Sequence, residues 1–355
     1  ILAGGKGTRL QSVLKGKPKC LAPIGQKTIL EHQIIEITKS NIQNVLIICC
    51  YESQQVINHI NQIKDNYKSL NISVFVEDYP GGTGGALAAA LNKLNKDFLL
   101  IMGDLFLSLN LSKIYNFGRK CDSDALLVCK YTDHPEDSDL IGLMADNYVK
   151  NFFLRDKNRN QIMHNKIPPL GNSGVFYFKK EFIKTFCTER CDIHQIIFSS
   201  LSNQVNLPRI NYFFTAEFIK DLGSVERLSE VNKLNLLPYQ MNSRIKSPAV
   251  FLDKDNTIIK DPKDKNPRNI KIDLFNKRLI NLLVKLNKTH RIFITTNQPG
   301  IAKGFFKEDD LVNHLFTLGS QLFSENINIS GFYFCPHHPQ KGFENEIKEL
   351  KISCS

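Results

Sequence analysis

Short apolar runs alternate with amphipathic segments of helical periodicity along this 355-residue chain. In the first half, apolar runs at residues 44–50, 72–78 and 97–104 are separated by helix-like segments at 28–40 and 83–94. Strands that alternate with helices in this way generally pair in parallel, with helices on both faces of the sheet. The pattern therefore predicts an α/β fold built on a mostly parallel sheet.

The alternation stops near residue 242 and then starts again. A closing helix at 223–237 is followed by the polar segment PYQMNSRIKSP, which has a proline near each end and is typical of a linker. After it, AVFLDKDNT and RIFITTNQPG have the pattern of strands and DLFNKRLINLLVKLNK that of a helix. We therefore expect two α/β domains with a linker between them, at residues 1–237, 238–247 and 248–355.

Composition narrows the class of partner and the compartment. The formal net charge is +11, but the lysines are scattered rather than gathered with aromatic residues into a basic face. We therefore expect small anionic substrates and no nucleic acid. No apolar run is long enough to span a membrane, so we expect no membrane partner. The odd count of nine cysteines, without a secretory signal, favours a reducing cytoplasm. The first apolar run is so short that we expect further residues before Ile1.

The segment LAGGKGTRL, residues 2–10, is a glycine-rich turn between a strand and a helix. Gly4, Gly5 and Gly7 allow backbone N–H groups to approach an anion closely, and the start of a helix favours a phosphate there. The spacing fits neither a Walker A loop nor the dinucleotide fingerprint. Arg9 in the loop and Lys19 in KPKCLAPIG could bracket a triphosphate and its leaving pyrophosphate.

Further motifs follow in a fixed order: EDYPGGTGGAL at 77–87, MGD at 102–104, GNSGVFYF at 171–178 and KDLGS at 220–224. Together with the glycine loop they resemble the sugar-1-phosphate nucleotidyltransferases over about residues 1–236. The resemblance implies catalysis by Arg9 and Lys19, magnesium ligation by Asp104 and Asp221, and sugar contact by Asn172. It also implies a nucleotide site formed by Leu2, Ala3, Gly4, Gly5, Gly7, Thr8, Glu77 and Gly82. For the cation that holds the sugar phosphate, Arg155 and Lys157 both remain candidates.

Asp253 and Asp255 follow an apolar strand in the second half of the chain. Carboxylates at i and i+2 point the same way, so one could attack phosphorus while the other serves as acid and base, with one Mg²⁺ shared between them. Together with Thr257 and FITTNQPGIAKG, this pattern resembles the haloacid dehalogenase phosphatases. More narrowly, it resembles their heptose-bisphosphate and histidinol-phosphate branch. The resemblance implies Asp253 as nucleophile, Asp255 as acid/base, and phosphoryl contacts from Thr296 and Asn297.

The chain ends on CPHHPQKGFENEIKELKISCS. The same branch carries a structural zinc loop, and the resemblance implies zinc ligation by Cys335, His337 and Cys354, with His338 as the neighbouring alternative to His337. The fourth ligand would stand at position 356, and the branch's later motifs would lie beyond Ser355. We therefore expect this incomplete phosphatase half to show no turnover.

The two resemblances together indicate a bifunctional enzyme of nucleotide-heptose biosynthesis for a surface polysaccharide. The expected reactions are removal of the 7-phosphate from a heptose bisphosphate and magnesium-dependent guanylyl transfer from GTP to D-glycero-α-D-manno-heptose 1-phosphate. Three alternatives remain: another sugar 1-phosphate or nucleotide, a histidinol-phosphatase-like second half, and a nucleotide-binding regulatory module without turnover. The sequence gives no oligomeric state.

Overall fold

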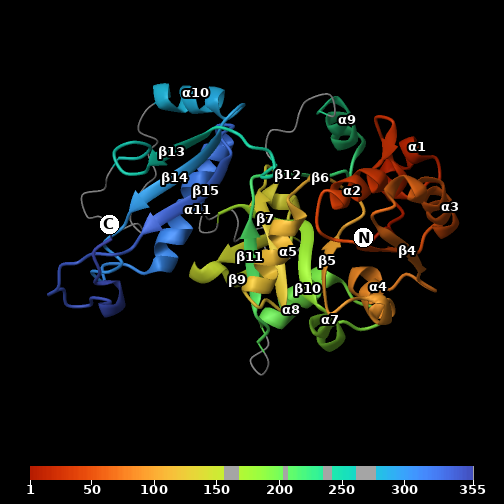
Figure 1. Cartoon of the computed structure of the whole chain (residues 1–355), viewed down its shortest axis with the longest axis horizontal. Helices are drawn as coiled ribbons and strands as arrows, with labels where there is room; N and C mark the ends of the chain where they lie inside the picture. Colours follow the sequence, from red (N-terminus) through yellow and green to blue (C-terminus); the bar gives the residue numbers. More distant parts are fainter. Residues whose placement is uncertain (156–167, 203–206, 235–241, 261–276, 355) are drawn as a thin grey trace. The chain divides into compact units, whose positions relative to one another are not determined.

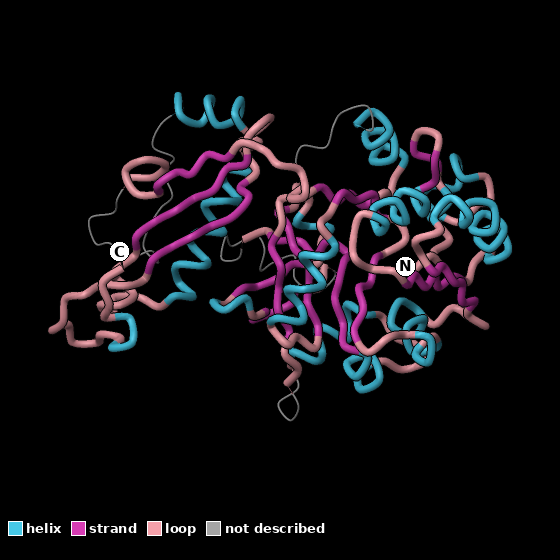
Figure 2. The backbone as a smooth tube through the Cα atoms, viewed as in Figure 1, coloured by secondary structure: helices cyan, strands magenta, loops and turns pink. Residues whose placement is uncertain are grey.

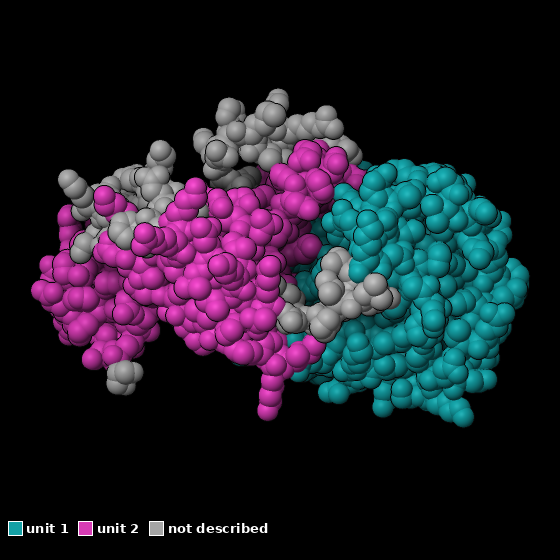
Figure 3. Space-filling view, turned by 90° about the horizontal axis from the view of Figure 1, so that it is seen from above, with its two compact units in different colours: residues 1–129, 172–213, 217–244 teal, residues 130–171, 214–216, 245–355 magenta. Residues whose placement is uncertain are grey.

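The computed structural model describes residues 1–155, 168–202, 207–234, 242–260 and 277–354. The chain divides into two compact units, coloured separately in Figure 3. Unit 1 comprises residues 1–129, 172–213 and 217–244, and unit 2 comprises residues 130–171, 214–216 and 245–355. Among the described residues, no helix has both the length and the apolar character needed to span a membrane.

A parallel arrangement at the start of unit 1 confirms the α/β prediction. Leu2 forms parallel bridges with both Ile48 and Met102, so the first residues lie between two neighbouring strands. Strand β3 (Asn44–Cys49) pairs in parallel with β4 (Asn71–Val76), and β5 (Asp97–Ile101) precedes Met102. The intervening helices are α2 (Ile29–Thr38), α3 (Ser53–Ile63) and α4 (Gly82–Ala89) (Figure 1).

The later strands of unit 1 are antiparallel. Strand β10 (Leu170–Lys179) runs antiparallel to β5, and β12 (Phe218–Asp221) runs antiparallel to β6 (Leu105–Ser108). Figure 2 shows these strands in magenta. The remaining long elements that contribute to unit 1 are α5 (Leu111–Lys120), β7 (Ala125–Tyr131), α7 (Lys180–Phe186), α8 (Ile193–Leu201), β11 (Ile210–Phe214) and α9 (Val225–Leu234). The closing helix predicted at 223–237 thus forms as α9, and residues 235–237 lie outside the described part.

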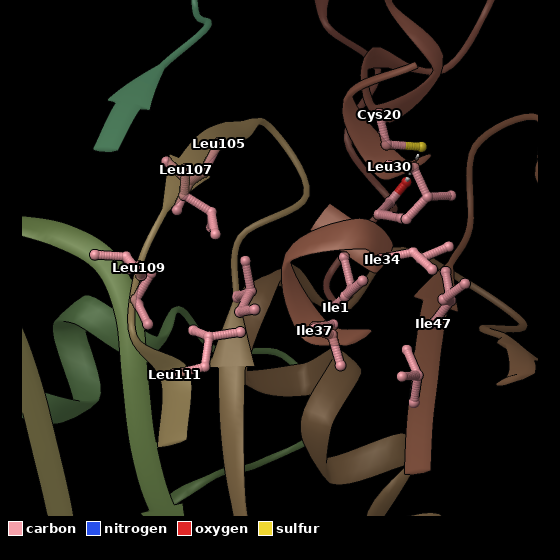
Figure 4. Packing of buried hydrophobic residues seen from close by; sticks show 14 of the residues in the cluster. Ile1, Cys20, Leu30, Ile34, Ile37, Ile47, Leu105, Leu107, Leu109 and Leu111 are labelled. Atoms are coloured by element: carbon pink, nitrogen blue, oxygen red, sulfur yellow. Dashed lines mark hydrogen bonds between the residues drawn. The ribbon is translucent and has the colours of Figure 1, made fainter. Parts of the chain in front are cut away.

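The apolar spacing of α2 explains where the core of unit 1 forms. Leu30, Ile34 and Ile37 recur at helical spacing and are buried. They belong to one cluster with Ile47 of β3 and Leu105 of β6 (Figure 4). The Thr28 side chain begins the helix by accepting a hydrogen bond from the Glu31 N–H. Burying each of these aliphatic side chains contributes about 1.5–3 kcal/mol, so this cluster fixes the strands that carry the site.

Part of the predicted linker is held against unit 1. Residues 238–241 lie outside the described part, but the Asn242 side chain donates to the buried carboxylate of Glu36 at 3.2 Å. Arg244 forms an ion pair with the same carboxylate and donates to the Leu109 carbonyl at 2.7 Å. Because Glu36 also accepts from the Leu109 N–H at 3.0 Å, its buried charge is fully paired. These bonds fix the end of unit 1.

Unit 2 contains a second parallel sheet, in which β13 (Ala249–Asp253), β14 (Arg291–Asn297) and β15 (Ile329–Cys335) pair in that order. Helices α10 (Lys277–Leu286) and α11 (Glu308–Ser324) supply buried leucines that cluster with Ile292, Ile294 and Ile329 of the sheet. The restart of the strand–helix pattern after the linker thus forms strands and a helix, as expected. Residues 130–171 of unit 2 include the antiparallel pair β8 (Leu140–Leu143) and β9 (Val149–Phe153).

Candidate active site

The glycine loop that follows Ala3 packs against the candidate cation Lys19. Gly7 has a φ of 61°, which is the left-handed region that favours glycine. A Cβ at this position would lie 2.9 Å from the Cβ of Lys19, so a larger residue would displace the lysine. After the loop, Thr8 begins a short 3-10 turn, and both Thr8 and Arg9 are exposed.

Strand pairing brings the two candidate metal carboxylates together. Asp221 ends β12, and the antiparallel register places it opposite Leu105, the residue after Asp104. The Leu222 N–H donates to the Asp104 carbonyl at 3.0 Å, which extends the same pairing by one bond. The MGD and KDLGS motifs therefore meet at the end of one two-stranded ladder.

Cations surround these two acids. The Lys19 Nζ lies 2.5 Å from Asp104 Oδ2 and 3.6 Å from Asp221 Oδ1. The Arg227 Nη1 lies 2.5 Å from Asp221 Oδ2. A Cβ built on Gly223 would lie 3.0 Å from Asp221 Oδ2 and 3.3 Å from an Arg9 Nη2, so Arg9 borders the same place. The arrangement joins two carboxylates to three basic side chains that can receive phosphate oxygens.

A cavity of about 230 Å³ opens beside this charged cluster. Its lining includes Leu2, Ala3, Gly4 and Gly5 of the loop, Lys19, Asp104, Glu77, Gly82 and Thr83. A larger cavity of about 820 Å³ lies along β3 and β5, but its walls are mostly apolar and amide side chains. The smaller cavity is therefore the one that combines an enclosed space with charges suited to a nucleotide.

Glu77 is the acidic group of the cavity wall farthest from an ordinary environment. Only 9 % of its surface is exposed, and this burial raises the pKa of its carboxyl above the usual value. The Gly81 N–H donates a hydrogen bond to the carboxylate and opposes that rise. The result is a hydrogen-bond acceptor directed at a small, mostly apolar space.

The other predicted residues of the first half are less closely grouped. Asn172 lies outside the cavity lining, and its Oδ1 accepts from the Gly174 N–H at 3.3 Å. The Gly174 carbonyl in turn accepts from the Met102 N–H at 3.1 Å, so Asn172 lies near the strand end that carries Asp104. Arg155 is exposed, and its N–H donates to Asp139. Lys157 lies outside the described residues.

Sequence reasoning did not identify Arg227 or Thr83. Arg227 lies in the first turn of α9, six residues after Asp221, and a basic residue one helical turn beyond an acidic motif was the available signal. Thr83 lines the cavity from the first turn of α4. Its hydroxyl group accepts a hydrogen bond from the Ile193 N–H at 2.9 Å, a contact that no local sequence pattern announces.

In unit 2, the structure places Asp255 and Thr296 in contact. The Thr296 hydroxyl group and the Gln298 side chain both donate to Asp255 Oδ2, at 3.1 and 2.9 Å. The buried Lys254 forms an ion pair with Asp255 Oδ1. Asp253 is exposed at the end of β13, where it pairs in register with Thr295. Asn297, the other predicted phosphoryl contact, is exposed at the end of β14.

The terminal cysteines and one histidine also come together in unit 2. The His337 Nδ1 lies 2.9 Å from Cys354 Sγ and 3.5 Å from Cys335 Sγ, and the two sulfur atoms are 3.6 Å apart. Ligand atoms of all three residues lie within 4.8 Å of one another. The His338 Nδ1 instead accepts from the Gln340 N–H at 3.2 Å, so of the two adjacent histidines it is His337 that joins the cysteines.

Comparison with known proteins connects the first 236 residues to one family. The family model described as "Nucleotidyl transferase" matches residues 1–236. The bifunctional protein GlmU of Methanococcus maripaludis is 31 % identical over 50 % of this chain and 38 % of its own length. The D-glycero-alpha-D-manno-heptose 1-phosphate guanylyltransferase of Campylobacter jejuni is 34 % identical over 32 % of this chain and 50 % of its own. The match thus spans half or less of these curated relatives.

Solved structures show the same fold. HddC from Yersinia pseudotuberculosis aligns with a TM-score of 0.53 at 23 % identity, covering 66 % of this chain and 96 % of that one. The same protein complexed with GMP-PN aligns equally well. At this identity the likeness establishes an α/β fold of this type and does not by itself establish a substrate.

Proposed function

We propose, from the premise that this chain belongs to the nucleotidyl transferase family, that unit 1 transfers a nucleotidyl group from a nucleoside triphosphate to a sugar 1-phosphate and releases pyrophosphate. One observation carries the proposal. Lys19, Asp104 and Asp221 converge within 3.6 Å beside a cavity that Glu77 also lines. Such a set supplies both a positive group for phosphate oxygens and oxygen ligands for a divalent cation.

The two carboxylates fit a magnesium ion. Oxygens of Asp104 and Asp221 both lie within 3.6 Å of the single Lys19 ammonium, so they converge on one position that favours positive charge. Carboxylate oxygens are the ligands that Mg²⁺ prefers, usually one or two from the protein with the rest from water and phosphate. Asp104 and Asp221 would hold the ion, which when bound supplies neutralisation of phosphate charge.

The remaining chemistry needs no protein nucleophile. The sugar 1-phosphate oxygen attacks the α-phosphorus in line, and the pyrophosphate leaves on the opposite side. Lys19 and Arg9 stabilise the negative charge that builds on the α-phosphate and on the leaving group. Arg227 holds Asp221 Oδ2 at 2.5 Å, which fixes the orientation of that carboxylate. The glycine loop lines the cavity with backbone groups that can approach the phosphates closely.

Glu77 supports GTP as the nucleotide. An ionised carboxylate only accepts hydrogen bonds and can accept two in parallel. Guanine presents two adjacent N–H donors on its pairing edge, whereas uracil and thymine present one donor between two acceptors. A buried carboxylate facing that edge therefore favours guanine. The guanylyltransferase named among the relatives and the GMP-PN complex of the structural neighbour are consistent with this choice.

The sugar is proposed as D-glycero-α-D-manno-heptose 1-phosphate. The support is the printed name of the Campylobacter relative, together with a second unit whose motifs resemble heptose-bisphosphate phosphatases. A mannose or glucose 1-phosphate remains the alternative substrate. A regulatory module without turnover is disfavoured because the carboxylate pair and Lys19 would then have no catalytic task.

The direct test is a pyrophosphate-release assay with the whole chain, four nucleoside triphosphates and a panel of sugar 1-phosphates. We expect release with GTP and heptose 1-phosphate in the presence of Mg²⁺. Release with a different pair would reassign the substrates, whereas no release with any pair would refute nucleotidyl transfer and favour the regulatory module.

A second candidate function concerns unit 2. We propose that Asp253 attacks a phosphoryl group, with Asp255 as acid/base, as in phosphoaspartyl phosphatases acting on a heptose 1,7-bisphosphate or on histidinol phosphate. The supporting observation is the Asp255 carboxylate held by Thr296 and Gln298, next to an exposed Asp253. These oxygens also fit a shared Mg²⁺.

Beryllofluoride, which mimics a phosphoryl group on a carboxylate, should bind unit 2 in the presence of Mg²⁺. We expect it to raise the Tm of the wild-type chain by a few degrees and to leave the Tm of Asp253→Asn unchanged. Glu325→Gln, which removes an exposed charge on the same unit, should respond like the wild type. An equal shift for Asp253→Asn would contradict the assignment of the nucleophile.

Cys335, His337 and Cys354 fit a structural zinc ion. Zinc takes sulfur ligands at about 2.3 Å and histidine nitrogen at about 2.0 Å in a tetrahedron, and the observed 3.6 Å between the sulfurs suits two corners of such a tetrahedron. These residues supply three of the four ligands, so a further ligand completes the site.

Chelator competition should therefore detect zinc on this chain. We expect Cys335→Ser to weaken zinc affinity at least tenfold and His338→Ala to leave it unchanged. If His338→Ala lost zinc as strongly as His337→Ala did, the ligand assignment would be wrong.

A further inference from the structure

The segment Thr188–Asp192, which we call the clamp, lies against the glycine-rich loop beside the proposed base pocket. The Cys191 carbonyl accepts hydrogen bonds from the N–H groups of Gly84 and Gly85, at 3.0 and 3.2 Å. The Cys191 N–H donates to the Gly81 carbonyl at 3.0 Å. The contact is therefore reciprocal, since one clamp residue is bonded to both the loop and the first turn of α4.

The glycines of the loop are required by this contact. A Cβ on Gly81 would lie 2.5 Å from the Glu189 carbonyl oxygen, and one on Gly85 would lie 2.4 Å from the same atom. Both distances are below any normal approach, so either side chain would push the clamp away. Gly85 lies outside the residues that line the cavity. Its lack of a side chain therefore serves the clamp rather than the ligand space.

The clamp keeps its shape through one thiol. The Cys191 Sγ accepts from the Thr188 N–H at 3.3 Å and donates to the Thr188 carbonyl at 3.2 Å, closing a tight turn. On the outside, the Tyr79 hydroxyl group donates to Glu189 at 3.3 Å, and the Arg190 guanidinium lies 5.7 Å from the Tyr79 ring centre. Tyr79 belongs to the loop, so the clamp holds it on both sides.

A short chain of hydrogen bonds leads from the clamp to the base pocket. The Cys191 N–H binds the Gly81 carbonyl, and the Gly81 N–H binds the buried Glu77 carboxylate. In parallel, the Ile193 N–H, just after the clamp, binds the Thr83 hydroxyl group at 2.9 Å. Glu77 and Thr83 both line the cavity, so each wall group has a partner that the clamp positions.

We propose that the clamp is a positioning element that sets the affinity of the site for the nucleoside triphosphate, with Cys191 as its central residue. This inference rests on the proposed function of unit 1. Because Lys19 and Asp104 belong to a different part of the cavity wall, a displaced clamp weakens nucleotide binding and leaves the reacting groups in place. Such loss of uniform binding raises KM and leaves kcat unchanged.

The test compares Cys191→Val, which keeps the volume and removes both thiol hydrogen bonds, with Cys191→Ser, which restores a hydroxyl group at the same place. We expect Cys191→Val to raise KM and Kd for GTP about tenfold, as expected for one or two lost hydrogen bonds, with kcat within about twofold. Cys191→Ser should recover most of the affinity. Gly85→Ala should raise KM at least as much, and the control Cys121→Ser should match the wild type.

The inference is overturned if Cys191→Val and Gly85→Ala, with wild-type Tm, bind GTP as tightly as the wild type. It is also overturned if kcat falls in the same proportion for Cys191→Val and Cys191→Ser. If Gly85→Ala does not fold, the comparison of the two Cys191 variants still decides. Failure of the proposed function is distinguishable, because the wild-type chain itself would then bind no triphosphate and release no pyrophosphate.

Discussion

Lys19→Met should lower kcat for pyrophosphate release about 10³-fold. The Lys19 ammonium is the positive group nearest both carboxylates, at 2.5 and 3.6 Å, and its charge would stabilise the α-phosphate as negative charge builds there. Methionine has a similar length and no charge, so the substitution removes the electrostatic interaction and little volume. Steady-state kinetics with saturating GTP and sugar 1-phosphate measure the effect.

The matched control is Lys17→Met, which changes an exposed lysine two positions away in the same motif. We expect it to retain kcat within about twofold, as exposed substitutions generally do little. Circular dichroism and Tm should show both variants folded. A folded Lys19→Met chain with kcat near that of the wild type would contradict the role assigned to Lys19.

Glu77→Gln should reverse the preference for guanine. The amide keeps the size of the side chain but replaces one acceptor oxygen by an NH₂ donor, which would face a guanine N–H group. We expect kcat/KM for GTP to fall at least 10²-fold, in the range seen when a polar site loses its matching partner. Activity with UTP or dTTP should fall less or rise. The measured quantity is the ratio of kcat/KM between GTP and each pyrimidine nucleotide.

Asp78→Asn is the control for the lost charge, since Asp78 is the exposed neighbour of Glu77. It should leave the GTP preference unchanged. If Asp78→Asn lowered the preference as much as Glu77→Gln did, general electrostatics rather than contact with the base would explain the effect. An unchanged preference in Glu77→Gln would exclude this residue from base recognition.

Periodicity predicted the strands of the first half closely. The expected strand at 44–50 is β3, Asn44–Cys49, and that at 72–78 is β4, Asn71–Val76. The helix expected at 83–94 ends earlier, at Ala89, and is followed by a separate 3-10 turn at 91–93. An apolar pattern of helical spacing does not distinguish a continuous α-helix from an α-helix followed by a tighter turn, because both place every third or fourth residue on one side.

The site was predicted in part because its motifs are local. Lys19, Asp104 and Asp221 each belong to a short recognisable segment, and their meeting follows from strands that end at the same edge. The contacts of Arg227 and of the clamp depend on the register of β12 with β6 and on backbone carbonyls that approach glycines. Such approaches are set by the packed fold and leave no distinctive residue pattern, so TERCD at 188–192 resembles an ordinary polar loop.

The central claim is that unit 1 joins a nucleotide to a sugar 1-phosphate. Its most direct test incubates the whole chain with GTP, heptose 1-phosphate and Mg²⁺ and measures the nucleotide sugar by mass spectrometry together with pyrophosphate. The account predicts GDP-heptose and pyrophosphate in equal amounts from the wild type and neither above background from Lys19→Met over the same time. Pyrophosphate without a nucleotide sugar, or no product with any nucleotide and sugar 1-phosphate, would contradict it.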